Sequence, residues 1–224
     1  DLVFYEGIAL FAGLNVVPKR SYLAAYSSRV AHATNLRLMQ AWFDQVQHAG
    51  LTPGSSIDLD FHTVPANTEQ EPLEKHYVSS RSRSQKGILV FLARDATERV
   101  LCYANAGLTK AERPEEILRF VQFWKQRTGR LPEELVFDSQ LTTYAQLDRL
   151  NQQHILFMTL RRRSQKMLRE IWSRPPSAWR RITLRSLTRS FRTPKVLDER
   201  IQLPGYQGSV RQVTVIELGH EDPT

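Results

Sequence analysis

The chain has 224 residues, of which 41% are hydrophobic and 24% charged, and this composition predicts a folded protein with a real core. No apolar run approaches the roughly eighteen residues of a membrane-spanning helix, and no signal-peptide pattern opens the chain, so no membrane partner is expected. The single cysteine, Cys102, cannot form an intrachain disulfide, which favours a reducing, cytoplasmic location.

The formal net charge of +8 is concentrated in one part of the chain. Residues 161–200 contain 13 Lys and Arg against 3 Asp and Glu, a local charge of +10, whereas the remainder holds 18 basic and 20 acidic residues. A solvated basic face is the alternative interpretation. The concentration favours contact with a polyanion, and we expect that partner to be a nucleic acid.

The predicted elements begin with a helix in the first fifty residues, where apolar side chains recur at three- and four-residue steps and Gly50 fits a helix end. A strand follows at 57–62, with Asp58, Asp60 and His62 alternating with apolar residues. The next two dozen residues, including "SSRSRSQKG", lack periodicity and predict a long loop. The run 88–105 predicts a hairpin whose first strand, "ILVFLA", is buried.

The second half of the main domain predicts two helix–strand units. A helix is expected from Pro114 to Gly129, a strand at 134–138, a helix at 141–152 and a strand at 155–160. The order β-β-β-α-β-α-β predicts a mixed sheet with helices on its faces. After a basic stretch at 161–185, short β-like pieces between 189 and 218 predict a β-rich subdomain.

Two aspartates carry the candidate chemistry of this sheet. Asp60 lies inside a strand that is otherwise made for burial, and Asp138 ends another strand. A carboxylate in a sheet interior costs several kcal/mol unless it is paired or binds a metal ion. If the two strands are neighbours, both side chains could share Mg²⁺ or Mn²⁺, since such ions prefer hard oxygen ligands and in pairs promote phosphoryl transfer.

Alternatives to a metal site remain open at this point. Asp138 could simply cap the helix that follows it, Asp58 shares a face with Asp60 and could exchange roles with it, and His62 is more readily explained as a structural histidine. No zinc pattern such as HExxH or CxxC, no phosphate-binding GxxxxGK[ST] loop and no GxSxG motif is present, which disfavours those chemistries.

These motifs resemble the catalytic domain of DDE transposases of the insertion-sequence type. "SSIDLDFHTVP" is similar to that family's first strand, "ELVFDSQLTTYAQLDRLNQQHILFMTLRRR" to its block of strand, aspartate, helix and strand, and "RTPKVLDERIQLPGYQGSVRQVTVIEL" to a β-rich insertion found in one branch. The resemblance implies an α/β, ribonuclease H-like mixed sheet flanked by helices. It implies three parts: a helical lead-in at 1–52, the catalytic core at 53–160 and a basic, β-rich insertion at 161–224.

The resemblance also implies a function in transposition and DNA recombination. Asp60 and Asp138 would be the first two metal-binding acids of a catalytic triad, acting with Mg²⁺ or Mn²⁺ to cleave DNA and join its 3′-hydroxyl to a target. The third acid, a glutamate on a helix after the insertion, is not evident, since Glu217 and Glu221 do not fit the family pattern. We expect it to lie beyond this chain or to be lost, so these residues alone could be inactive.

DNA partners follow from the same resemblance, with a homodimer possible because two element ends must be brought together, and with a nucleoid-associated cytoplasmic location. The candidate DNA-binding residues are Arg161, Arg162, Arg163 and Lys166 after the last core strand, and Arg81, Arg83 and Lys86 in the predicted loop. Trp172 and Trp179 could stack on a base, but buried packing is the favoured interpretation. A non-catalytic DNA-binding remnant and a ribonuclease H-like nuclease are the alternative functions.

Overall fold

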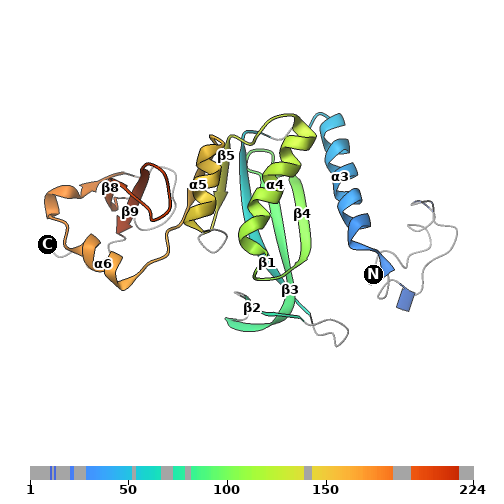
Figure 1. Cartoon of the computed structure of the whole chain (residues 1–224), viewed down its shortest axis with the longest axis horizontal. Helices are drawn as coiled ribbons and strands as arrows, with labels where there is room; N and C mark the ends of the chain where they lie inside the picture. The colour runs from blue at the N-terminus through green and yellow to red at the C-terminus, as the bar shows by residue number, and fades with distance from the viewer. Residues whose placement is uncertain are drawn as a thin grey trace.

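The computed structural model describes residues 11, 13, 21–22, 29–51, 54–66, 73–78, 82–138, 143–183 and 193–216. Its main unit is an α/β domain built on a mixed sheet (Figure 1). In chain order the elements are α3 (His32–His48), β1 (Ser56–Pro65), β2 (Lys75–Val78), β3 (Arg83–Asp95), β4 (Leu101–Leu108), α4 (Arg113–Thr128), β5 (Glu134–Phe137), α5 (Tyr144–Gln152) and β6 (Leu156–Thr159).

The sheet has the order β2-β3-β1-β5-β6, with β4 also paired to β3. Strand β3 runs antiparallel to β1, β2 and β4, whereas β1, β5 and β6 run parallel to one another. The predicted hairpin and the two helix–strand units are present, but the chain has one strand, β2, more than the predicted order β-β-β-α-β-α-β. Because β1, β5 and β6 are parallel, they point to the same edge of the sheet, where α/β proteins commonly place their sites, although β1 runs on beyond β5 to Pro65.

The local sequence explains the helix that covers the centre of the sheet. Helix α4 has Pro114 in its first turn, where the missing N–H has no intrahelical partner to lose, and Gly129 ends it with a φ of 72° that a side chain would disfavour. Its apolar residues recur at helical spacing and are buried against the sheet and against α3. They are Ile117, Phe120, Val121, Phe123 and Trp124.

The hydrophobic core lies on one side of the sheet. Leu59, Phe91 and Leu135 are buried among the residues of α4 and α5, and both helices lie on the same side of the strands in Figure 1. On the opposite side, Val90 and Val136 are only partly buried. The expectation of helices on both faces is therefore not met among the described residues, since both crossovers run over the same face.

Two segments differ from their predicted structure. The stretch predicted as a long loop after β1 contains β2, and β3 begins already at Arg83, so part of it extends the sheet. In β2 the buried positions are His76 and Val78, and β3 begins with the polar residues 83–86, so an apolar count misses both segments. Helix α6 (Gln165–Trp172) was not predicted, although Ser164 caps it by accepting a hydrogen bond from Met167 N–H at 3.1 Å.

The basic segment after β6 forms a smaller, second unit. After α6 come a short 3-10 helix, η4 (Pro176–Ala178), and a three-stranded antiparallel sheet of β7 (Arg180–Arg181), β8 (Lys195–Ile201) and β9 (Val210–Ile216). This unit contacts α5 and β6: the Gln207 N–H donates to Asp148 Oδ1 at 2.7 Å, and Tyr206 packs edge-on against Phe157. Among the described residues, no helix combines the length and apolar character needed to cross a bilayer.

Buried polar groups of the core are held by specific partners. Glu116 of α4 is fully buried, and its carboxylate accepts hydrogen bonds from Tyr103 Oη at 2.9 Å and Asn105 Nδ2 at 2.8 Å and pairs with Arg119 at 3.2 Å. Burial, followed by the charge of Glu116, raises the pKa of Tyr103. Burial also raises the pKa of the Cys102 thiol to about 11, so this thiol is an inert part of the core.

Replacing Glu116 by alanine is expected to destabilise the fold, because Tyr103 and Asn105 would lose their buried acceptor. The free energy of unfolding in urea should fall by about 3–5 kcal/mol. The matched control is Glu170→Ala on α6, whose exposed and distant pair with Lys166 should contribute less than about 1 kcal/mol. Equal losses in the two variants would contradict a special role for the buried carboxylate.

Candidate functional site

The pairing of β1 with β5 brings the two predicted acids to neighbouring positions. The parallel register runs from Ser56 opposite Glu134 to Leu59 opposite Phe137. The next residue on each chain is Asp60 and Asp138, respectively. Because neighbouring strands lie about 4.8 Å apart, the two aspartates come side by side at the carboxyl edge of the sheet.

Both aspartates are exposed. Ile57 and Leu59 of β1 and Leu135 and Phe137 of β5 are buried on the helix-covered face, so Asp60 points to the other face of the sheet. Asp138 directly follows the last residue of β5. A ligand in solvent can therefore reach two carboxylates at neighbouring backbone positions.

Asp58 shares this face but has a different environment from Asp60. It lies directly opposite Arg94 in the β1–β3 ladder, and the two side chains form an ion pair at 2.9 Å. Asp60 faces Leu92 instead, and within the described part of the chain it has no hydrogen-bond or ion-pair partner. The structure thus distinguishes two acids that the sequence left interchangeable, and it leaves Asp60 the more available ligand. His62 is exposed on the same face.

A divalent ion would find two hard oxygen ligands at this edge. Mg²⁺ accepts few protein ligands and completes its shell with water and phosphate, so two adjacent carboxylates fit its chemistry. Across the described segments, no group of three His, Cys, Asp or Glu side chains gathers closely enough to hold a metal ion. Glu217 and Glu221 lie outside the described residues.

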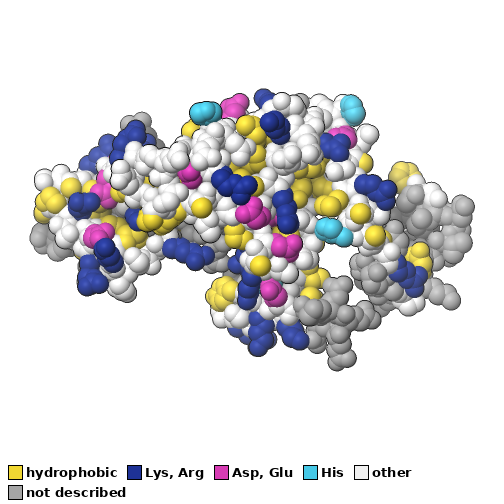
Figure 2. All heavy atoms as spheres, viewed as in Figure 1, with side chains coloured by type: hydrophobic (Ala, Val, Ile, Leu, Met, Phe, Trp, Pro, Cys, Tyr) yellow, Lys and Arg dark blue, Asp and Glu magenta, His cyan; other side chains and the backbone are white. Residues whose placement is uncertain are grey.

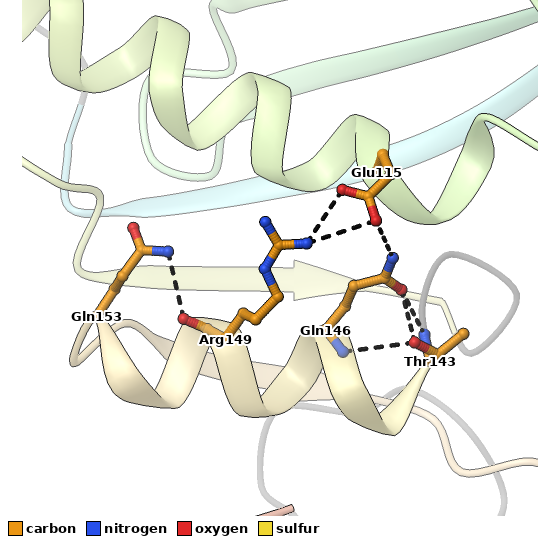
Figure 3. Close-up of polar contacts among 5 residues, drawn as sticks. All are labelled: Glu115, Thr143, Gln146, Arg149 and Gln153. Carbon is orange, nitrogen blue, oxygen red and sulfur yellow. Dashed lines mark hydrogen bonds and ion pairs between the residues drawn. The ribbon is translucent and has the colours of Figure 1, made fainter. Parts of the chain in front are cut away.

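Asp138 does not cap the helix that follows it. Thr143 is the N-cap of α5, and it forms a capping box in which its Oγ1 accepts from Gln146 N–H at 3.4 Å while the Gln146 side chain accepts from Thr143 N–H at 3.1 Å (Figure 3). The alternative role of Asp138 as the cap of α5 is therefore excluded. Residues 139–142, between the acid and the cap, lie outside the described residues.

Glu115 ties the first turns of α4 and α5 together beside the site. Its carboxylate accepts from Gln146 Nε2 at 2.9 Å and pairs with Arg149 at 3.2 Å, as Figure 3 shows. Gln146 thereby links the capping box to α4 through one side chain. The start of α5, which follows the segment after Asp138, is fixed against α4.

Asp95 positions the other end of β1, and the sequence analysis missed this role. The buried carboxylate accepts hydrogen bonds from the backbone N–H of Gly54 at 2.6 Å and of Thr97 at 3.0 Å. It also accepts a hydrogen bond from the backbone N–H of Glu98. A Cβ on Gly54 would come within 3.0 Å of Asp95 Oδ2. An aspartate followed by a threonine two residues later, in "RDATE", is the local signal of such a turn.

The arginines after β6 divide into two kinds. Arg161 donates to Gln212 Oε1 at 2.6 Å and so ties the end of β6 to β9. Arg162 and Arg163 are exposed, and Lys166 is 84% exposed with only a distant contact to Glu170 at 3.9 Å. Arg162, Arg163 and Lys166 therefore present cations to solvent, whereas Arg161 has a structural bond.

The second group of predicted basic residues does not lie on a loop. Arg83 and Lys86 are exposed residues of β3, paired with Val78 and Lys75 of β2, and Arg81 lies outside the described residues. Figure 2 shows dark-blue side chains at the tip formed by β2 and β3 and over the small unit of α6, β8 and β9. Arg83 and Lys86 are exposed cations, but they belong to strand β3 and not to the predicted loop.

The small unit also corrects the interpretation of its tryptophans. Trp172 is 67% exposed, so the expectation that it packs in a core is wrong for this residue, whereas Trp179 is half-buried.

Three arginines surround the two acids of β8: Arg180 and Arg211 pair with Asp198, and Arg174 pairs with Glu199. Hydrogen bonds from Arg211 lower the pKa of Asp198. Cations still outnumber acids in this unit.

Comparisons with known proteins give limited information. No family model matches the chain, and no curated protein matches it. One solved structure that resembles it is a piggyBac transposase in a synaptic complex with hairpin DNA, with a TM-score of 0.39 and 12% sequence identity. The match covers 77% of this chain and 35% of that chain, and at this level it carries no argument about fold or function.

Thr143→Ala should weaken the start of α5, because the capping box would lose the hydroxyl that accepts from Gln146. The expected loss is about 1 kcal/mol in the free energy of unfolding, measured in urea. Thr143→Ser keeps the hydroxyl and is expected to retain most of the stability. If serine and alanine destabilise equally, the cap is not the reason that α5 begins here.

Proposed function

We propose that this chain is the catalytic part of a DNA transposase of the DDE type, with a ribonuclease H-like fold. The observation that carries the proposal is the β1–β5 register, which brings Asp60 and Asp138 side by side on one exposed edge. The six-stranded mixed sheet, in which β1, β5 and β6 run parallel and β3 runs antiparallel to β1, supports the proposed fold.

In the proposed reaction the two aspartates are metal ligands at a DNA phosphodiester. Bound Mg²⁺ or Mn²⁺ would lower the pKa of an attacking water or 3′-hydroxyl and stabilise the leaving oxygen. Asp60 supplies a carboxylate without a competing cation, and Asp138 supplies a second from the next strand. The β1–β3 ladder fixes the position of Asp60, and the Asp58–Arg94 ion pair two residues earlier adds a side-chain contact between the same strands.

The exposed cations then orient the DNA. Three exposed cations follow β6, the strand beside β5, and they can bind phosphates next to the two acids: Arg162, Arg163 and Lys166. Arg83 and Lys86 present a second basic area on β3. A homodimer, which would hold two element ends together, is part of this proposal, as is a nucleoid-associated location.

A second candidate function is a DNA-binding protein that has lost catalysis. The observation in its favour is that no third acid joins Asp60 and Asp138 within the described residues. Such a protein would keep the basic surface and bind DNA with a strong salt dependence, but it would cut nothing. A nuclease of the same fold would cut DNA or RNA and join nothing.

Strand cleavage in the natural, full-length chain tests the proposal. Purified protein and supercoiled plasmid would be incubated with Mg²⁺ or Mn²⁺, and nicked, linear and joined products separated on gels. Asp60→Asn and Asp138→Asn should each lower the cleavage rate at least a hundredfold, about 2.7 kcal/mol of transition-state stabilisation, and added EDTA should abolish cleavage.

The matched control is Asp44→Asn, a half-buried carboxylate of α3 that pairs with Arg127 of α4, and it should cut like the unaltered protein. Cleavage that persists in Asp60→Asn or Asp138→Asn would contradict the two-acid mechanism. Nicks without joined strands would instead support a nuclease, and DNA binding without cleavage would support the non-catalytic alternative.

A further inference from the structure

A groove with mostly apolar walls lies between α3 and β4. Its volume of about 900 Å³ is within the range of sites that hold ligands. Helix α3 and strand β4 supply most of the apolar lining: Leu36, Leu38, Met39, Leu101, Ala104 and Ala106. Figure 2 shows hydrophobic side chains, in yellow, gathered between the places that β4 and α3 occupy in Figure 1. Neither Asp60 nor Asp138 lines the groove, so it is separate from the candidate site.

Helix α3 is fastened to the sheet at one end, and this keeps the groove open. Its buried residues are Phe43 and Val46, both in the second half of the helix. In the same half, Trp42 Nε1 donates a hydrogen bond to the Leu101 carbonyl at 3.3 Å. In the first half, Leu38 lines the groove and remains 69% exposed. The first half of α3 therefore presents apolar side chains to a space that no described residue fills.

Strand β4 presents an unprotected edge to this space. It pairs with β3 on one side, and no other strand of the described residues pairs with it. Proteins normally protect such an edge with charged residues, proline or a short strand, because its outward N–H and C=O groups are a template for another strand. Strand β4, "LCYANAGL", has eight residues without a charge or a proline. By contrast, β2 carries Lys75 and β6 has only four residues.

The charges around the groove define the class of occupant. Among the described residues no Lys or Arg lines it, and its one carboxylate, Glu74, accepts the Lys110 backbone N–H at 2.7 Å. The lining residue His76 is 2% exposed, and burial lowers its pKa, so its ring is neutral near pH 7. A phosphate or a charged side chain would lose hydration here without gaining an opposite charge. An uncharged, apolar occupant is therefore complementary to these walls, whereas DNA is not.

We propose that the groove between α3 and β4 binds an extended, uncharged segment of a partner protein, which adds a strand to the outer edge of β4. In this mode, backbone hydrogen bonds to the strand supply affinity, and alternate side chains of the segment enter the apolar groove. Leu36, Leu38 and Met39 of α3 form the wall that these side chains contact. The inference goes beyond the proposed function, since it involves neither the two acids nor DNA.

A peptide selection on the full-length protein tests the class of partner. Random peptides of about ten residues, enough to span the eight residues of β4, would be displayed on phage and selected against the immobilised protein. The selected peptides should lack charge and proline and should carry apolar residues at alternate positions. Selected peptides that are charged or without this alternation would overturn the proposal, and so would a selection that enriches no sequence.

The selected consensus peptide then tests strand addition. Its dissociation constant would be measured by fluorescence anisotropy, for the plain peptide and for two forms that carry N-methyl groups on one or the other alternate set of amides. Only one set faces β4 in an added strand, so one form should bind at least about tenfold more weakly while the other binds like the plain peptide. Equal losses in the two forms would contradict pairing with the strand edge.

A variant of α3 tests the position of the site. Leu38→Gln removes an exposed apolar side chain from the groove wall and should weaken binding of the consensus peptide about tenfold. The matched control is Val213→Gln, which replaces an exposed apolar residue of β9 outside the groove and should leave the affinity unchanged. Thermal unfolding of both variants would show that the fold is retained. Equal affinities in the two variants would overturn the assignment to this groove.

Sedimentation of the unaltered protein without peptide tests the rival occupant, a second copy of the chain. The proposal predicts that Leu38→Gln leaves the oligomeric state unchanged, because the groove is free until a partner segment enters. A dimer that dissociates in Leu38→Gln but not in Val213→Gln would show that the groove holds a second copy, and it would overturn the proposed partner segment.

Discussion

The parallel pairing of β1 with β5 is the constraint on which the account of this molecule depends. It takes two aspartates that are 78 positions apart in number (60 and 138) and sets them at neighbouring places on one edge. The pairing is held by burial of the alternate residues, since Ile57, Leu59 and Leu135 are 0–4% exposed. A shift of one residue in this register would move one aspartate to the buried face.

Charge is arranged around that edge in a consistent way. Asp58 is neutralised by Arg94 within the sheet, whereas Asp60 has no such partner in the described part of the chain. On the cationic side, Arg127 and Arg149 pair with acids, whereas Arg162 and Arg163, which follow β6, are exposed.

Much of this arrangement could be predicted from the sequence, and the failures have physical causes. Period-two and helical patterns identified β1, α4 and β5, because burial on one face leaves a strong apolar signal. Register is set by tertiary packing, so only the structure could separate Asp58 from Asp60. Strand β2 was missed because it is short and one of its two buried residues is His76, and the contact of Asp95 with Gly54 was missed because the two residues are distant in the chain.

Binding of Mn²⁺ to the full-length protein, followed by electron paramagnetic resonance, tests most directly whether the two acids form one site. The account predicts that Asp60→Asn and Asp138→Asn each weaken Mn²⁺ binding, and that the double variant is no weaker than the more impaired single variant, since residues sharing one ligand are not additive. Unchanged Mn²⁺ affinity in either single variant, or losses that simply add, would contradict a metal site shared by Asp60, in the middle of β1, and Asp138, directly after β5.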